Sequence, residues 1–194
     1  MSVLSNVHVY GLDNAIRVSK YPMSVDVSRL TDEMTKTTRR LGSAPPGSGH
    51  DTFLNGIVVQ FDLTFTVKAW TEAQRYHFLE FISSCSTMHR ITQFDLDQQY
   101  IEYVDPRVVE IMKEKIADYN NETDPEEQKR KYLEILYTNP TGFKLTAGMT
   151  TNYRQLKTIV NQRSNHRLPE WREFCKEVMK FPRFKELCYS EERV

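Results

Sequence analysis

The chain has 194 residues, enough for one domain with a substantial hydrophobic core. Its 26 basic residues balance its 26 acidic residues, so the sequence does not favour a partner held by bulk charge, such as duplex DNA. No apolar run is long enough to span a bilayer, and the N-terminus has no apolar signal core. The three cysteines are scattered and form no Cys-x-x-Cys pair, which excludes a zinc ribbon and a disulfide framework. We therefore expect a cytoplasmic protein.

The first fifty residues predict short strands, a surface helix and a loop. Alternating apolar and polar residues at 7–10 and 15–18 predict two strands joined by a turn. Apolar residues at helical spacing predict a helix over 28–41. The run of Gly, Ser and Pro at 42–49 cannot lie inside a helix or strand, so it predicts a loop that leads to His50.

The middle of the chain contains its clearest strand. Residues 57–67 form it, because from Val59 onward the odd positions are apolar. Apolar residues then cluster at helical spacing, which predicts a helix over 70–82. The small hydroxylated residues at 83–87 end that helix. A further short strand is predicted at 143–147.

Helical patterns dominate the second half. Prolines near the first turns predict helices over 106–121 and 125–137, which we expect to form an antiparallel hairpin. Three more helices are predicted at 152–163, 168–179 and 181–187. The elements together predict an α+β fold, in which an antiparallel sheet is flanked by helices. We expect a single domain over residues 1–194, with the hairpin at 106–137 as an insertion.

The helix at 152–163 carries polar groups on an apolar face. Thr150 and Thr151 precede it, and both are good N-cap residues. Four positions at spacings of four, three and four share one face: Asn152, Leu156, Ile159 and Arg163. A buried guanidinium needs a planar acceptor such as a carboxylate, a phosphate or a pyrimidine edge. That acceptor is either an internal glutamate, such as Glu170 or Glu173, or a ligand.

Two other groups of polar residues are candidates for a site. One is His50–Asn55, between the glycine-rich loop and the main strand. The other is Arg75-Tyr76-His77 with the residues that follow it, namely Ser83, Ser84, Ser86, His89 and Arg90. His77 and His89 lack a cysteine or carboxylate in a recognised pattern, so we expect no metal. Simpler interpretations stay open: an exposed turn for His50, a polar helix opening for Asn152, a helix end for the serines and a core position for His77.

Three segments in this order resemble the flavin-dependent thymidylate synthases (ThyX). The family's His-x-[Ser/Thr]-x-x-Glu-His element is similar to residues 50–56, His-Asp-Thr-Phe-Leu-Asn-Gly. Its Arg-His-Arg signature, with a downstream Ser and Arg-Tyr, is similar to Arg75-Tyr76-His77 with the serines and Arg90. Its Asn-x-Arg-Ser-Leu helix, with an arginine eleven positions after the Asn, is similar to residues 152–163. Glu170-Trp171-Arg172 resembles a further family segment, and the likeness extends over roughly residues 45–175.

The chain also departs from the family pattern. Asn55 and Gly56 stand where the first element ends in Glu-His. Two of the three residues of the Arg-His-Arg signature are changed, and the signature's Asn-Glu is absent. The resemblance therefore supports the fold more strongly than it supports the same chemistry.

The resemblance implies specific ligands. It implies that FAD binds between the subunits of a homotetramer and that dUMP stacks on the flavin. It also implies that methylenetetrahydrofolate supplies the one-carbon unit and that NADPH reduces the flavin. Arg163 would be the catalytic residue, because its guanidinium would hold the pyrimidine edge and make C5 nucleophilic. Ser86 and Arg90 would bind the nucleotide phosphate. The residues expected to line FAD are His50, Thr52, Arg75, His77, Asn152 and Arg154.

Two functions follow from this comparison. The first is flavin-dependent transfer of one carbon to C5 of a uracil deoxynucleotide. Its product is thymidylate or a related modified pyrimidine, for example a hydroxymethylated base of the kind that some viruses require. The second is a catalytically inactive relative that binds a nucleotide or has a structural role. An accessory protein that binds nucleic acid is disfavoured by the zero net charge.

Overall fold

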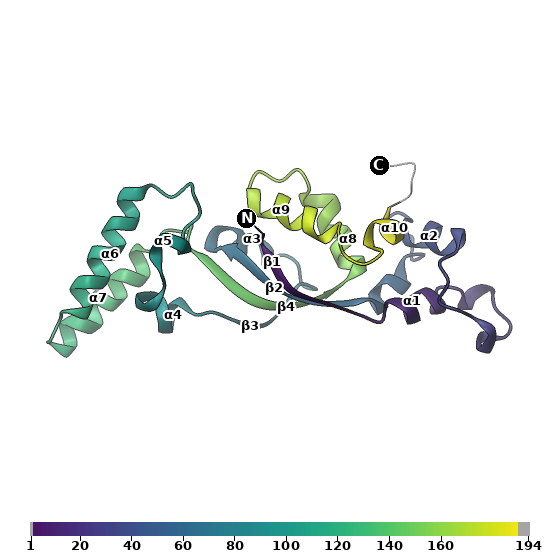
Figure 1. Ribbon diagram of the computed structural model, residues 1–194, viewed down its shortest axis with the longest axis horizontal. Coiled ribbons are helices and arrows are strands. Elements are labelled where there is room, and N and C mark those ends of the chain that lie inside the picture. Colours follow the sequence, from purple (N-terminus) through teal and green to yellow (C-terminus); the bar gives the residue numbers. More distant parts are fainter. Residues whose placement is uncertain (1, 190–194) are drawn as a thin grey trace. The chain divides into compact units, whose positions relative to one another are not determined.

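The computed structural model (Figure 1) describes residues 2–189. These residues divide into two compact units. Unit 1 contains residues 2–63, 76–82 and 148–189, and unit 2 contains residues 64–75 and 83–147. The organisation as a single domain stays a prediction. Within residues 2–189 no helix is both long and apolar enough to cross a membrane.

Four strands form one antiparallel sheet with the order β1-β2-β4-β3. Their bounds are Leu4–Tyr10 (β1), Val58–Thr66 (β2), Glu80–Ser84 (β3) and Lys144–Asn152 (β4). In the antiparallel pair of β1 and β2, Leu4 lies opposite Leu63 and Tyr10 lies opposite Val58. The register shifts between Ser5 and His8, where Asn6 adopts a φ of 50°. The predicted α+β fold class is confirmed.

Ten α-helices accompany the strands in the described part of the chain. Those of unit 1 are Leu12–Val18 (α1), Lys36–Gly42 (α2), Tyr153–Arg163 (α8), Pro169–Val178 (α9) and Phe184–Cys188 (α10). Those of unit 2 are Val67–Ala73 (α3), Thr87–Arg90 (α4), Leu96–Gln99 (α5), Pro106–Asn120 (α6) and Pro125–Thr138 (α7). Short 3₁₀ turns lie at Tyr21–Met23, Val27–Arg29, Thr52–Gly56 and Ile91–Gln93.

The core of unit 1 lies between the sheet and the C-terminal helices. Figure 1 shows α8 and α9 together on one side of the strands. The rings of Phe61 on β2 and Phe174 on α9 meet at 6.0 Å, and Trp171 meets Phe174 at 5.8 Å. All three side chains are buried. Burial of large aromatic surface therefore fixes α9, and with it the adjacent end of α8, against the sheet.

Unit 2 is built around the helical hairpin. Asp105 caps α6 and Asp124 caps α7, each by accepting a hydrogen bond from a backbone amide two residues later. One buried apolar cluster holds this unit together, and its members are Ile91, Leu96, Tyr100, Met112, Ile135 and Phe143. The predicted hairpin of two helices is confirmed, and α6 packs against α7.

Three predictions of secondary structure are wrong. The segment predicted as a strand at 15–18 belongs to α1, because Ala15 and Ile16 are neighbours on the buried face of a helix that follows Gly11 in the left-handed region (φ 75°). The helix predicted over 28–41 is limited to α2. It begins after Thr35, whose side chain accepts a hydrogen bond from the Thr38 amide at 3.1 Å.

The third error concerns residues 70–82. The Thr66 hydroxyl accepts a hydrogen bond from the Ala69 amide at 3.2 Å and starts α3 earlier than predicted. The helix ends at Ala73, and a turn leads into β3. Every residue of β3 is exposed, so this strand shows no alternation in its sequence. The predicted strand at 143–147 is confirmed but extends to Asn152.

The burial of the cysteines predicts their reactivity. Cys85 is exposed, whereas Cys175 and Cys188 are buried. Burial raises the pKa of the Cys175 thiol to about 12 and also raises the pKa of Cys188, so both stay as unreactive thiols. We expect iodoacetamide to label Cys85 in the native protein and all three cysteines after denaturation, as measured by intact mass. Rapid labelling of a second thiol in the native protein would contradict this burial.

Candidate functional site

A buried lysine fixes the glycine-rich loop to α8. Lys157 Nζ donates hydrogen bonds to the Gly42 carbonyl at 2.7 Å, the Ala44 carbonyl at 2.6 Å and Asp51 Oδ2 at 3.0 Å. Lys157 is only 3% exposed and Asp51 only 1%. An ammonium group has three donors, and all three are used here. Lys157 therefore holds both ends of the loop, Gly42 at its start and Asp51 after its end, against α8.

The loop itself is open and turned by glycines. Gly47 (φ 86°) and Gly49 (φ 77°) lie in the left-handed region, and a Cβ at either position would meet no atom within 4 Å. These glycines are thus needed for the backbone turn and not for close packing. The Thr52 hydroxyl donates to the Gly49 carbonyl at 2.6 Å and closes the turn. His50 is exposed at the end of this loop, as the sequence predicts.

Asp51 also binds Arg154 on the first turn of α8. Arg154 Nε donates to Asp51 Oδ1 at 3.0 Å, and 29% of the arginine side chain is exposed. Within residues 2–189 the terminal nitrogens Nη1 and Nη2 of Arg154 make no hydrogen bond. Because Asp51 lies between His50 and Thr52, this ion pair brings three predicted site residues into one neighbourhood. The result is a partly exposed cation beside an open loop, which suits a bound anion.

Asn152 is the N-cap of α8. Its side-chain oxygen accepts a hydrogen bond from the Gln155 amide at 3.0 Å, and its backbone is extended (φ −141°, ψ 167°). Thr150 and Thr151 lie inside β4, so the prediction that they cap the helix is wrong. The simpler interpretation of Asn152 as a polar helix opening is confirmed, and its contact with FAD stays a prediction.

Arg163 lies at the other end of α8, about 14 Å from Arg154 along the helix axis. Its Nε donates a hydrogen bond to the Tyr76 hydroxyl at 2.7 Å. The central carbon of its guanidinium lies 5.3 Å from the ring centre of Trp171, which is fully buried. Glu173, one of the two acidic partners that the sequence suggests, forms its ion pair with Lys176 at 3.4 Å. The other, Glu170, is buried on α9.

The two charged residues of the 75–77 segment are both exposed. Arg75 and His77 lie in the turn between α3 and β3, because α3 ends at Ala73. The interpretation of His77 as a core histidine is therefore wrong. Within the described residues neither side chain makes a hydrogen bond.

Ser86 is the N-cap of the short helix α4 of unit 2, and Arg90 is the last residue of that helix. The Ser86 carbonyl accepts a hydrogen bond from the Arg90 amide at 3.1 Å, and Arg90 Nη1 donates to Gln93 Oε1 at 2.7 Å. Ser86 is half-buried and Arg90 is exposed. Their predicted role, binding of a phosphate, stays a prediction.

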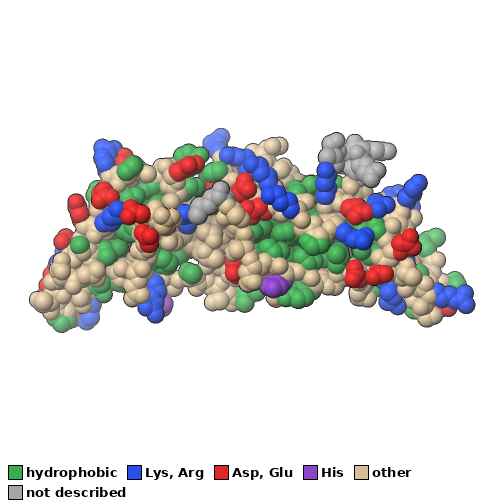
Figure 2. All heavy atoms as spheres, viewed as in Figure 1, with side chains coloured by type: hydrophobic (Ala, Val, Ile, Leu, Met, Phe, Trp, Pro, Cys, Tyr) green, Lys and Arg blue, Asp and Glu red, His purple; other side chains and the backbone are tan. Residues whose placement is uncertain are grey.

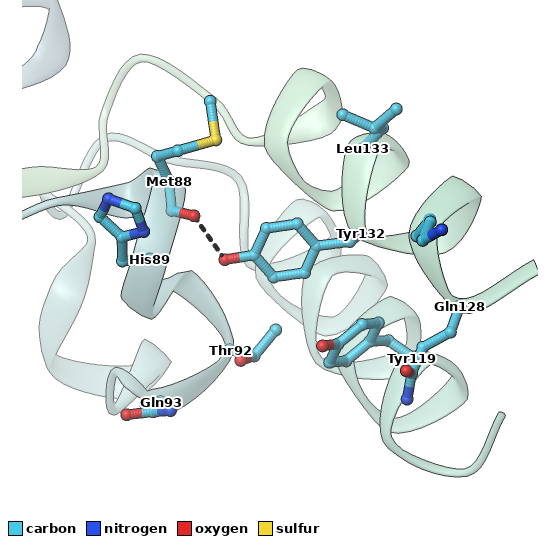
Figure 3. A pocket seen from close by; sticks show the side chains of 9 residues that line it. Met88, His89, Thr92, Gln93, Tyr119, Gln128, Tyr132 and Leu133 are labelled. Carbon is cyan, nitrogen blue, oxygen red and sulfur yellow. Dashed lines mark hydrogen bonds between the residues drawn. The ribbon is translucent and has the colours of Figure 1, made fainter. Parts of the chain in front are cut away.

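The same helix borders a pocket of about 600 Å³ (Figure 3). The Tyr132 hydroxyl points across this pocket and donates to the Met88 carbonyl at 3.0 Å, while its ring meets Tyr119 at 5.2 Å. The other lining residues are His89, Thr92, Gln93, Gln128, Lys129 and Leu133. The sequence did not predict this pocket, because its walls come from two separate segments of the chain, residues 88–93 and 119–133. Across residues 2–189 there is no cluster of three or more His, Cys, Asp or Glu side chains suited to a metal ion.

Three residues of the site were not predicted from the sequence. Asp51 and Lys157 were not singled out, although Asp51 stands between His50 and Thr52 and Lys157 interrupts a helical run of apolar positions. Tyr76 stands in the middle of the 75–77 segment, but nothing in the sequence indicates that it contacts Arg163. The one available signal was a lysine on the apolar face of a predicted helix, because a buried ammonium group needs several hydrogen-bond acceptors.

The chain was compared with known proteins. No protein-family model matches it, and no curated protein matches it in sequence. A crystal structure of the flavin-dependent thymidylate synthase ThyX from Helicobacter pylori, complexed with FAD and dUMP, is 15% identical with a TM-score of 0.72. That match covers 98% of this chain and 99% of the other. A second structure of ThyX from Helicobacter pylori with FAD and dUMP has the same identity and TM-score and covers 98% of both chains. The likeness confirms the fold to which the sequence resemblance points.

The clamp formed by Lys157 can be tested by its effect on stability. Lys157→Met removes three hydrogen bonds and leaves buried acceptors without a donor, so we expect the free energy of unfolding to fall by about 3 kcal/mol. Lys176→Met, which breaks an exposed ion pair on α9, is the matched control and should cost less than about 1 kcal/mol. Chemical denaturation measures both variants. Equal losses would show that the clamp is no more important than a surface pair.

Proposed function

We propose that this protein transfers a one-carbon unit to C5 of a uracil deoxynucleotide in a flavin-dependent reaction. The product is dTMP or a related modified pyrimidine. The single observation that carries the proposal is Arg163, whose guanidinium is held by a hydrogen bond to Tyr76 and by the face of Trp171. A fold shared with two structures that contain FAD and dUMP supports it. We also propose methylenetetrahydrofolate as the carbon donor and NADPH as the reductant.

The residues around the glycine-rich loop fit a cofactor that carries phosphates. Within residues 2–189 the two terminal nitrogens of Arg154 make no hydrogen bond, and they lie next to the exposed His50 and Thr52. Gly47 and Gly49 leave the loop open on its outer side. FAD, when bound, would supply the hydride that reduces the transferred carbon. We propose that His50, Thr52, Asn152 and Arg154 hold it, and Arg75 and His77 stay proposed contacts on the basis of the resemblance.

Arg163 would act on the pyrimidine ring. A guanidinium beside a ring carbonyl stabilises the negative charge that develops on that oxygen while C5 attacks the one-carbon unit. It needs no change of protonation state, because arginine stays charged in proteins. No side-chain nucleophile takes part in this proposal. Ser86 and Arg90 are proposed to bind the nucleotide phosphate.

A catalytically inactive relative is the second candidate. Asn55 and Gly56, which replace Glu-His of the family pattern, are both exposed at the end of the 3₁₀ turn Thr52–Gly56. Neither residue can carry or accept a proton as the family pair can. Binding of dUMP without any turnover, when reduced flavin and methylenetetrahydrofolate are supplied, would select this alternative.

We also propose that the protein is a homo-oligomer, by resemblance a tetramer. Figure 2 shows hydrophobic side chains gathered over β1, which is an edge strand of the sheet. Val7 is 39% exposed and Tyr10 is 49% exposed. A groove of about 790 Å³ runs beside them, and its apolar lining residues are Leu4, Val7, Val9, Phe181 and Pro182. An exposed edge strand next to an apolar groove is a surface that a second copy can cover.

The proposed assembly gives a measurable expectation. Multi-angle light scattering should yield the mass of a tetramer, or of a dimer, for the full chain. Val7→Lys introduces a charge at the centre of the apolar surface and should shift the distribution toward the monomer. A wild-type protein that stays monomeric at all concentrations would contradict the proposal.

The role of Arg163 is tested by Arg163→Lys. Lysine keeps the charge but lacks the planar fork, so we expect dUMP affinity to fall by about 100-fold and thymidylate formation to be lost. Calorimetry with dUMP and a turnover assay measure the two effects. Arg167→Lys, an exposed arginine just after α8, is the matched control and should behave as the wild type. Unchanged dUMP affinity in Arg163→Lys would refute the assigned role.

A further inference from the structure

Asp51 is a single buried carboxylate that two cations of α8 share. Its Oδ1 accepts a hydrogen bond from Arg154 Nε at 3.0 Å, and its Oδ2 accepts one from Lys157 Nζ at 3.0 Å. The other two acceptors of Lys157 are uncharged backbone carbonyls. Within residues 2–189 no second acidic side chain forms an ion pair with either cation. One negative charge therefore faces two positive charges, and this group of three residues carries one excess positive charge.

The excess charge can be reached at Arg154. Its side chain is 29% exposed. Across the described part of the chain Nη1 and Nη2 make no hydrogen bond, and neither is one of the buried polar atoms that lack a partner, so both reach solvent. Arg154 lies in the first turn of α8, where the positive end of the helix dipole adds to its charge. This end of α8 therefore offers an anion two charged donors on one planar group.

Asp51 fixes where those donors lie. A guanidinium is planar, so a hydrogen bond at Nε restricts the directions that Nη1 and Nη2 can take. The carboxylate is itself held, because each of its oxygens accepts a hydrogen bond and the residue is buried. A guanidinium that is already oriented loses less conformational freedom when a ligand binds, and this raises affinity.

We propose that Asp51 is a positioning residue for a ligand that carries phosphate groups. It holds Arg154 at Nε and leaves Nη1 and Nη2 for two phosphate oxygens, while Lys157 compensates the negative charge that would otherwise repel the ligand. The choice of FAD as the natural ligand rests on the function proposed above. The positioning of Arg154 rests only on contacts within the chain.

The charge of Asp51 and its positioning role affect anion binding in opposite directions. If Asp51 acted only through its charge, Asp51→Asn would strengthen the binding of inorganic pyrophosphate, because a carboxylate repels an anion. The positioning role predicts weaker binding, because a neutral amide holds Arg154 Nε less firmly. We expect the pyrophosphate affinity of the full chain, measured by calorimetry at constant ionic strength, to fall by roughly tenfold. The NMR signal of Arg154 Nε–H should exchange faster with water in the variant, with or without pyrophosphate.

The matched control is Asp105→Asn. Asp105 also accepts a hydrogen bond from an arginine Nε, that of Arg107 at 3.1 Å, but it lies on the surface of unit 2. This variant should bind pyrophosphate as the wild type does. If Asp51→Asn does not fold, Lys157→Met is compared with the double variant Lys157→Met/Asp51→Leu, since neither buries an unpaired ammonium group. We expect the double variant, which offers Arg154 no acceptor, to bind pyrophosphate more weakly.

The outcomes separate this proposal from the function on which it builds. The positioning role is refuted if Asp51→Asn binds pyrophosphate as tightly as the wild type, or more tightly. It is also refuted if affinity falls while the exchange of Arg154 Nε–H stays unchanged, because Asp51 would then act by another route. A wild type that binds pyrophosphate but not FAD, with weaker binding in Asp51→Asn, supports the positioning role and contradicts the proposed cofactor. A wild type that binds neither ligand refutes the phosphate site.

Discussion

The buried ion pair between Lys157 and Asp51 is the interaction on which the rest of the site depends. Moving two charges out of water costs several kcal/mol per ion, and only complete hydrogen bonding offsets that cost. Here the ammonium has three acceptors, and both Asp51 oxygens accept a bond, one from Lys157 and one from Arg154. The glycine-rich loop is thereby held at both ends, and His50 and Thr52 are brought beside Arg154. This pair therefore contributes, with the Arg154–Asp51 pair, to holding the loop against α8.

One helix presents both arginines of the proposal. In each, Nε donates a hydrogen bond within the chain, to Asp51 for Arg154 and to Tyr76 for Arg163. Arg154 and Arg163 are separated by about 14 Å on α8, so in the proposed function they would bind two separate ligand groups. A phosphate at one end and a pyrimidine edge at the other would each find a guanidinium that is already oriented.

Strong periodicity made part of this structure predictable. The strand at 57–67, the helix at 152–163 and the hairpin follow from apolar spacing and from prolines at the first turns, and the order of motifs indicated the fold. The short elements could not be predicted from apolar spacing. Residues 15–18 show the same apolar pattern for a strand and for one turn of helix, and β3 has no buried face to produce alternation.

The partners within the site could not be predicted from one sequence. Asp51 and Lys157 are 106 positions apart, and Tyr76 and Arg163 are 87 apart. Local propensity carries no information on which distant residues will meet, since tertiary packing decides it. The sequence indicated that Arg163 needs a planar acceptor, supplied either by an internal glutamate or by a ligand. The phenol of Tyr76 and the ring of Trp171 as its neighbours became visible only in the fold.

The absorbance spectrum of the purified full chain, after incubation with FAD and removal of free cofactor, tests the central claim most directly. The account predicts that the flavin bands stay with the protein and that added dUMP perturbs them, because the cofactor and the pyrimidine would be held by the same helix. A colourless protein that binds neither FAD nor dUMP would contradict it.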